Sequence, residues 1–263
     1  MAHLYFILTR GCPLHCPHCY LDAGPDKYED TMSVADFGKC VDNFPKGGLN
    51  SITLSGGEVF SLEERLYDYL DIIKDKIPDY KLVLQTSGYW AVDNKTTKDR
   101  LERLREFRVR KIDITSNDRF HEQKGFDKQN AERLQGLVEE AELGVSYRGC
   151  DYDIVPLGRG VNLETPKRAE FQQSCIGFLY SNELTVDWEG SVYPCCFGMF
   201  KFPGNLINEK LTKIVGLKGQ DRELIQEFLV MNHSGFKGLA DLKGIECESN
   251  NACLKCVEYN LNR

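Results

Sequence analysis

The chain has 263 residues, enough for one large domain or for one domain with a small appendage. Its formal charge of −7, without any lysine- or arginine-rich block, argues against a nucleic-acid partner. There is no secretion signal and no apolar run of membrane-spanning length, so we expect a cytoplasmic protein without a membrane partner. Eleven cysteines in a reducing compartment indicate metal or redox chemistry rather than disulfides.

Strand-like and helix-like segments alternate through the first 150 residues. Five strands are predicted, at residues 3–10, 51–55, 81–87, 110–116 and 144–149. The helix after the first strand is predicted to begin at an N-cap, Ser33, and the next helix at a capping box of Ser61 and Glu64. Residues 153–160 are a candidate sixth strand, with too few residues before them for a helix. The alternation predicts an α/β fold with a parallel sheet.

The pattern changes after residue 165. Residues 183–196 predict a β-hairpin that turns at residues 188–190. Cysteines flank this hairpin and end the chain: Cys175, Cys195, Cys196, Cys247, Cys253 and Cys256. We therefore expect two domains, residues 1–165 and a cysteine-rich module over residues 166–263.

Three cysteines follow the first strand in a C-x3-C-x2-C run, Cys12, Cys16 and Cys19. A disulfide needs an even number of thiols, and a closed zinc or iron–sulfur site needs four ligands, so three thiols suit a site with one open position. A Gly-Gly-Glu sequence at residues 56–58 follows the second strand. The carboxyl ends of parallel strands meet at one rim, so we expect these two segments to lie close together.

Together, the three-cysteine run after the first strand and the Gly-Gly-Glu after the second resemble the radical S-adenosylmethionine (radical SAM) superfamily. The tail resembles the SPASM/Twitch extension of that superfamily, because fourteen residues separate Cys175 from Gly190 and four separate Gly190 from Cys195. The resemblance implies a partial (β/α)6 TIM-like barrel with a C-terminal cysteine-rich extension of the Twitch/SPASM type.

The resemblance implies a 4Fe–4S cluster held by Cys12, Cys16 and Cys19, whose remaining iron binds S-adenosylmethionine. Reductive cleavage of S-adenosylmethionine gives methionine and a 5′-deoxyadenosyl radical, which takes a hydrogen atom from the substrate. The alternatives at this loop are a zinc site that also uses His15 and His18, or inert core thiols.

In the tail, the resemblance implies one auxiliary 4Fe–4S cluster. Four thiolates from separate segments are its expected ligands: Cys175, Cys195, Cys253 and Cys256. Either Cys247 or Cys196 is able to replace one of them, and a structural zinc is the alternative metal.

The resemblance also assigns strand-end residues to S-adenosylmethionine. Gly56, Gly57 and Glu58 are expected to contact its amino group, with the glycines allowing close backbone approach. Polar residues after strands three to five are placed near the methionine carboxylate and the ribose: Thr86, Ser87, Ser116, Asp118 and Arg148. For these five, a solvated position at a strand end is the alternative.

Two candidate catalytic residues lie at the same rim. Cys150 follows the fifth strand, and family members that invert stereocentres use a thiol to return a hydrogen atom; a buried rim thiol is the alternative. His121 either reaches the substrate or lies on a solvated loop. Cys40 falls on an apolar helical face, which predicts a plain core cysteine.

These features predict an oxidoreductase-like radical SAM enzyme that modifies a peptide or protein, as in the maturation of ribosomally made peptides. The alternative is a small-molecule dehydrogenase acting on an aminocyclitol or a sugar alcohol. A flavodoxin or ferredoxin is the expected electron donor in both cases. A non-catalytic electron carrier or zinc-binding adaptor is a third hypothesis, but it would not need Gly-Gly-Glu beside a three-thiol loop.

Overall fold

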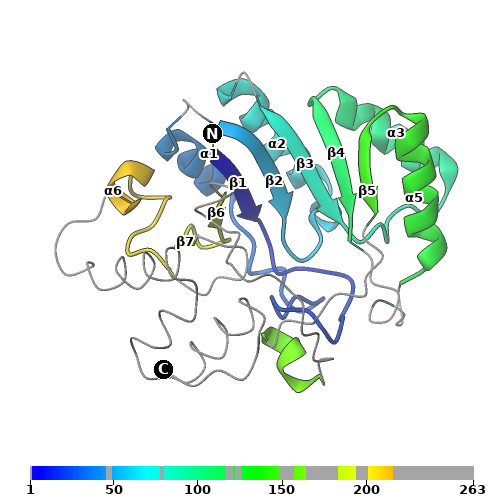
Figure 1. Ribbon diagram of the computed structural model, residues 1–263, viewed down its shortest axis with the longest axis horizontal. Coiled ribbons are helices and arrows are strands. Elements are labelled where there is room, and N and C mark those ends of the chain that lie inside the picture. Colours follow the sequence, from blue (N-terminus) through cyan, green and yellow to red (C-terminus); the bar gives the residue numbers. More distant parts are fainter. Residues whose placement is uncertain are drawn as a thin grey trace, which may run out of the picture.

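One mainly parallel sheet organises the molecule (Figure 1). The computed structural model describes residues 2–45, 49–77, 80–115, 121, 126–147, 157–163, 183–193 and 201–215. Its first five strands are β1 (Ala2–Ile7), β2 (Leu49–Ser55), β3 (Lys81–Thr86), β4 (Val109–Ile114) and β5 (Gly144–Tyr147). They pair in parallel in the order β5-β4-β3-β2-β1, which confirms the predicted α/β fold.

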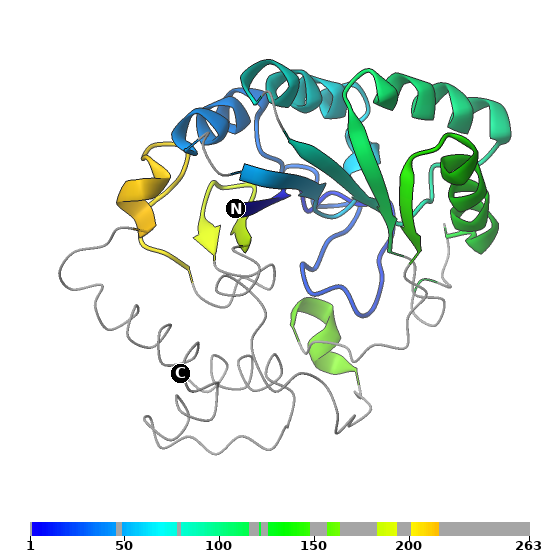
Figure 2. The same ribbon diagram turned by 45° about the horizontal axis from the view of Figure 1, so that its top comes forward.

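Helices cover one face of this sheet, which we call the outer face (Figure 2). They are α1 (Val34–Asn43), α2 (Glu64–Lys76), α3 (Asn94–Arg105) and α5 (Lys128–Glu140). Three shorter helical segments, η1 (Val59–Leu62), η2 (Gly158–Asn162) and α6 (Leu211–Val215), lie between or after these elements. No helix in the described part of the chain is long and apolar enough to cross a membrane.

Alternate residues of the strands build the core beneath these helices. Apolar side chains on the outer face are inaccessible to solvent, as at Leu4, Phe6, Ile52, Leu54, Leu82, Leu84 and Ile112. An aromatic chain joins the layers, because the rings of Phe6 and Phe37 lie 4.8 Å apart and those of Phe37 and Tyr69 lie 5.0 Å apart. The period of two along each strand therefore directs one set of residues into the helix layer.

The helix starts confirm one sequence prediction and correct another. Ser33 caps α1, because its Oγ accepts a 3.0 Å hydrogen bond from the Asp36 backbone N–H. The predicted capping box of Ser61 and Glu64 is wrong, since α2 begins after Glu63 without a side-chain cap. Ser61 Oγ instead donates to the Glu58 carbonyl at 2.6 Å within the η1 turn.

The predicted hairpin is confirmed, but it joins the same sheet. β6 (Glu183–Val186) pairs in parallel with β1, and β7 (Val192–Tyr193) pairs with β6 in the antiparallel sense. The place beside β1 is therefore taken by β6, whereas residues 158–160 of the predicted sixth strand lie in η2 and the prediction of a strand there is wrong. The domain boundary at residue 165 stays a prediction, and β6 comes from beyond it.

Candidate cofactor site

The segment between β1 and α1, residues 8–33, carries the three clustered cysteines and is called the thiol loop below. Cys12 and Cys16 are 7% and 8% exposed, Cys19 is half-buried, and the three belong to a small apolar cluster of their own. The loop folds back on itself, because Cys12 N–H donates to the Gly24 carbonyl at 3.1 Å and Cys19 N–H donates to the Cys16 carbonyl at 3.1 Å. The thiols thus lie on an ordered turn at the carboxyl end of β1.

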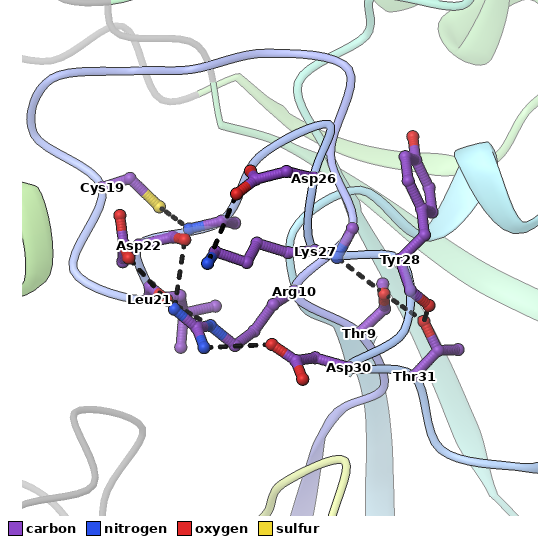
Figure 3. A network of polar contacts seen from close by, with 12 residues as sticks. Thr9, Arg10, Cys19, Leu21, Asp22, Asp26, Lys27, Tyr28, Asp30 and Thr31 are labelled. Carbon is purple, nitrogen blue, oxygen red and sulfur yellow. Dashed lines mark hydrogen bonds and ion pairs between the residues drawn. The ribbon is translucent and has the colours of Figure 1, made fainter.

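Arg10 cross-links the thiol loop from within (Figure 3). Its Nε donates to the Leu21 carbonyl at 2.9 Å, and its two terminal nitrogens bind the carboxylates of Asp22 and Asp30 at 3.2 and 3.0 Å. The guanidinium also lies 5.5 Å from the centre of the Trp188 ring, in the turn between β6 and β7. The loop is therefore held by polar contacts, unlike the apolar core under the helices.

The Gly-Gly-Glu turn at the end of β2 docks directly onto the thiol loop. Gly57 N–H donates to the Thr9 carbonyl at 2.6 Å, and Glu58 N–H donates to the Gly11 carbonyl at 3.0 Å. Gly56 has φ +148°, and a Cβ on Gly57 would lie 2.3 Å from the Gly11 carbonyl oxygen. Only glycines permit this approach, so their close backbone contact is with the loop that carries the thiols.

Glu58 joins the end of β2 to the end of β3. Its side chain is 1% exposed, and its Oε2 accepts from the Ser87 backbone N–H at 2.9 Å and from Ser87 Oγ at 2.8 Å. Its Oε1 accepts from Thr86 Oγ1 at 2.8 Å and from the Phe60 backbone N–H at 3.2 Å. Burial raises the pKa of the Glu58 carboxyl, although these hydrogen bonds oppose the shift. The structure thus brings together five expected binding residues: Gly56, Gly57, Glu58, Thr86 and Ser87.

The chemistry of the three thiols fits an iron–sulfur cluster, since thiolates are the soft ligands that such clusters use. Burial raises the pKa of the Cys12 thiol, and the Glu58 carboxylate and the other two thiols add to the shift. As placed, no three His, Cys, Asp or Glu side chains of the described residues are gathered closely enough to hold a metal ion. Cluster binding requires the three thiols to lose their protons.

Comparison with models of known families identifies the family of this chain. Residues 6–171, more than half of the chain, match the model of the Radical SAM superfamily. The chain belongs to the radical SAM superfamily. Membership implies a 4Fe–4S cluster and S-adenosylmethionine, and the three-thiol loop beside Gly-Gly-Glu lies where the resemblance placed it.

Two curated proteins resemble parts of this radical SAM chain. One is the antilisterial bacteriocin subtilosin biosynthesis protein AlbA of Bacillus subtilis, 30% identical over 110 residues, or 42% of this chain and 22% of AlbA. The other is Fe-coproporphyrin III synthase of Methanosarcina barkeri, 25% identical over 183 residues, or 58% of this chain and 44% of the synthase. The chain spans less than half of the length of either relative.

Solved structures share the fold over nearly the whole chain. BtrN in complex with AdoMet and 2-DOIA superposes with a TM-score of 0.62 at 18% identity, over 96% of this chain and 97% of BtrN. Native anSMEcpe with bound AdoMet superposes with a TM-score of 0.61 at 14% identity, over 100% of this chain and 96% of anSMEcpe. At these identities the likeness shows a radical SAM fold and nothing about substrates.

His121 is buried against the thiol loop of the radical SAM domain rather than solvated. It is 6% exposed, and its ring centre lies 4.9 Å from that of His18 in an edge-on contact and 5.4 Å from that of Phe126. Burial, followed by the charges of His121 and Arg159, lowers the pKa of His18 to about 4. His15 is exposed, so the two histidines of the zinc alternative lie in different surroundings.

Several predicted site residues lie outside the described residues, and their predictions stay open. They are Ser116, Asp118, Arg148, Cys150, Cys175, Cys195, Cys196, Cys247, Cys253 and Cys256. Cys40, by contrast, is buried in the main core on α1, and burial raises its pKa to about 12, as expected for a plain core cysteine.

The sheet also has a polar inner face, opposite the helices, which was not predicted from the sequence. Tyr5 Oη donates to Ser55 Oγ at 2.8 Å, and Ser55 Oγ donates to Gln85 Oε1 at 2.6 Å, which links β1, β2 and β3. Lys111 and Asp113 form a 2.6 Å ion pair on β4. The same face carries further polar side chains: His3, Ser51, Thr53 and Thr185.

A signal for this face was present in the sequence. In β2, Ser51, Thr53 and Ser55 alternate with apolar residues, and His3 and Tyr5 do so in β1. Such alternation indicates a strand with one polar and one apolar face.

Proposed function

We propose that this protein reductively cleaves S-adenosylmethionine and abstracts a hydrogen atom from its substrate. The observation that carries the proposal is the pair of backbone hydrogen bonds from Gly57 and Glu58 to Thr9 and Gly11, which joins the Gly-Gly-Glu turn to the thiol loop. Cys12, Cys16 and Cys19 would hold the 4Fe–4S cluster. When bound, the cluster supplies the electron that splits S-adenosylmethionine into methionine and the 5′-deoxyadenosyl radical.

The chain's own residues prepare the place where S-adenosylmethionine would bind. The Glu58 carboxylate is occupied by Thr86 and Ser87, so it fixes the two strand ends relative to the thiol loop. We propose that the backbone of residues 56–58 faces the methionine amino group, and that Ser87, Ser116, Asp118 and Arg148 complete the site. Burial of Cys12 and Cys16 limits access of water and oxidants to the site.

We further propose one auxiliary 4Fe–4S cluster, held by Cys175, Cys195, Cys253 and Cys256 with Cys247 as an alternative ligand, in a Twitch/SPASM-like tail. A flavodoxin or ferredoxin in the cytoplasm would supply the electron for each turnover. The auxiliary cluster would accept the electron that the substrate radical loses and would pass it on to the flavodoxin or ferredoxin, so the overall reaction would be oxidoreductase-like.

The substrate we propose is a peptide or protein, modified as in the maturation of ribosomally made peptides. The support is the 30% identity to AlbA, which is named for subtilosin biosynthesis. The second candidate is a small polar molecule such as an aminocyclitol or sugar alcohol. It is favoured by the superposition on BtrN with 2-DOIA, which covers 97% of that chain.

The chemistry is tested by anaerobic reconstitution with iron and sulfide, followed by dithionite and S-adenosylmethionine. We expect 5′-deoxyadenosine and methionine from the wild-type chain and from Cys40→Ala, and neither product from Cys16→Ala. Cys40 is the matched control because it is a buried thiol outside the loop. Zinc in place of iron, or turnover unaffected by Cys16→Ala, would refute the proposal.

The substrate class is tested by deuterium transfer. The reconstituted enzyme is mixed with extract of perdeuterated cells of the source organism, and the 5′-deoxyadenosine is analysed by mass spectrometry. The extract fraction that transfers deuterium contains the substrate. We expect proteinase treatment of that fraction to abolish deuterium transfer. Transfer that survives the treatment would show that the substrate is a small molecule.

A further inference from the structure

Arg159, a residue that no sequence motif singled out, holds the thiol loop from outside. It lies in η2, more than a hundred residues beyond the loop, and Figure 2 shows η2 (light green) beside the loop (blue). Its Nε donates to the Cys16 carbonyl at 2.9 Å, and its terminal nitrogens donate to Asp22 Oδ1 at 2.8 Å and to the Ala23 carbonyl at 2.6 Å. Its own backbone N–H donates to the Cys19 carbonyl at 3.1 Å.

The backbone of η2 fits tightly against the same turn. Gly158 has φ +52°, and a Cβ there would lie 2.5 Å from the Tyr20 carbonyl oxygen and 2.6 Å from that of Cys19. Residues 158–159 therefore approach the carbonyls of Cys19 and Tyr20 closely, and at residue 158 this approach needs glycine. Arg159 is 16% exposed, so water competes weakly for these hydrogen bonds.

Asp22 is shared between two arginines. Its Oδ2 pairs with Arg10 at 3.2 Å and its Oδ1 with Arg159 at 2.8 Å. One carboxylate therefore binds both the arginine within the thiol loop and the arginine in η2. Asp22 has φ +51°, a left-handed conformation that costs energy for a residue with a side chain. The loop is thus fixed in a strained turn between Cys19 and Ala23 by charge-assisted bonds from both sides.

We propose that Arg159 is a positioning residue that sets the conformation of the thiol loop and thereby retains its cluster. A guanidinium presents donors in several directions at once, and here they reach Cys16, Asp22 and Ala23. A lysine at this position keeps the charge but has a single ammonium, which cannot reach all three acceptors. The conformation of the cysteine turn therefore depends on η2, a segment more than a hundred residues further along the chain.

The first test uses the chain without metal, so it does not depend on the proposed function. Alkylation rates of individual cysteines are measured by mass spectrometry in the wild type, in Arg159→Lys and in the matched control Arg133→Lys. Arg133 is also half-buried and donates to a carbonyl, that of Ala91 at 2.6 Å, but away from the loop. We expect about a tenfold faster reaction of Cys16 in Arg159→Lys alone, the effect of losing one charge-assisted hydrogen bond.

Cys40 reports global unfolding in the same samples, since it is buried under the helices. A Cys16 rate that stays at the wild-type value, or a rise shared equally by Cys16 and Cys40, would overturn the proposal. In reconstituted protein we expect Arg159→Lys to lose iron to a chelator at least about tenfold faster than Arg133→Lys, as for other groups that orient metal ligands. Equal loss would also overturn it. Failure of the wild-type chain to take up iron would instead refute the proposed function.

Discussion

The two faces of the sheet differ in what they contribute. On the outer face, alternate residues such as Leu82 and Leu84 are fully buried beneath helices, within one continuous apolar core. On the inner face most of the intervening positions carry hydroxyl, amide or charged groups, and several of these bond from strand to strand, as Tyr5, Ser55 and Gln85 do.

Parallel sheets that are covered by helices on both faces have apolar residues on both. A polar inner face therefore sacrifices burial that the fold would otherwise use for stability. The Thr185 hydroxyl shows a second cost of a polar face, because it is fully buried without a hydrogen-bond partner among the described residues. We infer that the outer face supplies stability, while the inner face serves the ligands of the site at the carboxyl ends of the strands.

The largest effect should come from truncating adjacent residues of β3 that point to opposite faces. Leu84→Ala should reduce the free energy of unfolding by about 2–5 kcal/mol, because it leaves a cavity in the main core. Val83→Ala, at a half-buried inner position, should cost roughly 1 kcal/mol. Urea unfolding of both variants is the measurement. Equal costs would contradict the difference between the two faces.

A substitution of Glu58 tests whether its hydrogen bonds stabilise the ends of β2 and β3. Glu58→Gln should reduce the free energy of unfolding by about 1–3 kcal/mol, because either orientation of the amide places its NH2 against a backbone N–H, of Ser87 or of Phe60. Glu102→Gln on the exposed side of α3 is the control and should change stability very little. If thermal unfolding shows no difference between the two variants, the hydrogen bonds of Glu58 do not stabilise the fold.

A substitution of Tyr5 tests whether the inner face binds substrate in addition to contributing to stability. Tyr5→Phe should cost about 0.5–1.5 kcal/mol, as should Tyr80→Phe, whose hydroxyl bonds to the Phe107 carbonyl away from this face. Only Tyr5→Phe should raise the KM for the substrate identified by deuterium transfer. A similar KM for both variants would argue against a role of the inner face in substrate binding.

The smallest effect is a pH dependence. Burial lowers the pKa of His3 on β1, although Asp113 opposes the shift. A histidine whose folded pKa is depressed binds fewer protons in the folded chain, so stability falls as the pH falls through its unfolded pKa of about 6.5. His3→Gln should therefore lose less stability on acidification than the wild type, by under about 1.4 kcal/mol per pH unit. Parallel denaturation curves of the two proteins across this pH range would contradict the prediction.

Much of the fold could be predicted from the sequence, because it rests on local periodicity. The alternation of strands and helices gave the parallel sheet, and the order of Cys12, Cys16, Cys19 and residues 56–58 placed the site at its carboxyl end. Two errors arose where tertiary contacts override local preference. Ser61 bonds to the Glu58 carbonyl instead of capping α2, and residues 158–160 of the candidate sixth strand lie in η2, packed against the thiol loop.

The spacing of Cys12, Cys16 and Cys19 was enough to predict that the three thiols share one loop, and in the structure they belong to one small apolar cluster. The partners of that turn were decided only in three dimensions. Arg159 reaches the thiol loop from a distant part of the chain, through hydrogen bonds to the backbone carbonyls of Cys16 and Ala23. A backbone carbonyl carries no sequence signature, so only the path of the folded chain determines which side chain meets it.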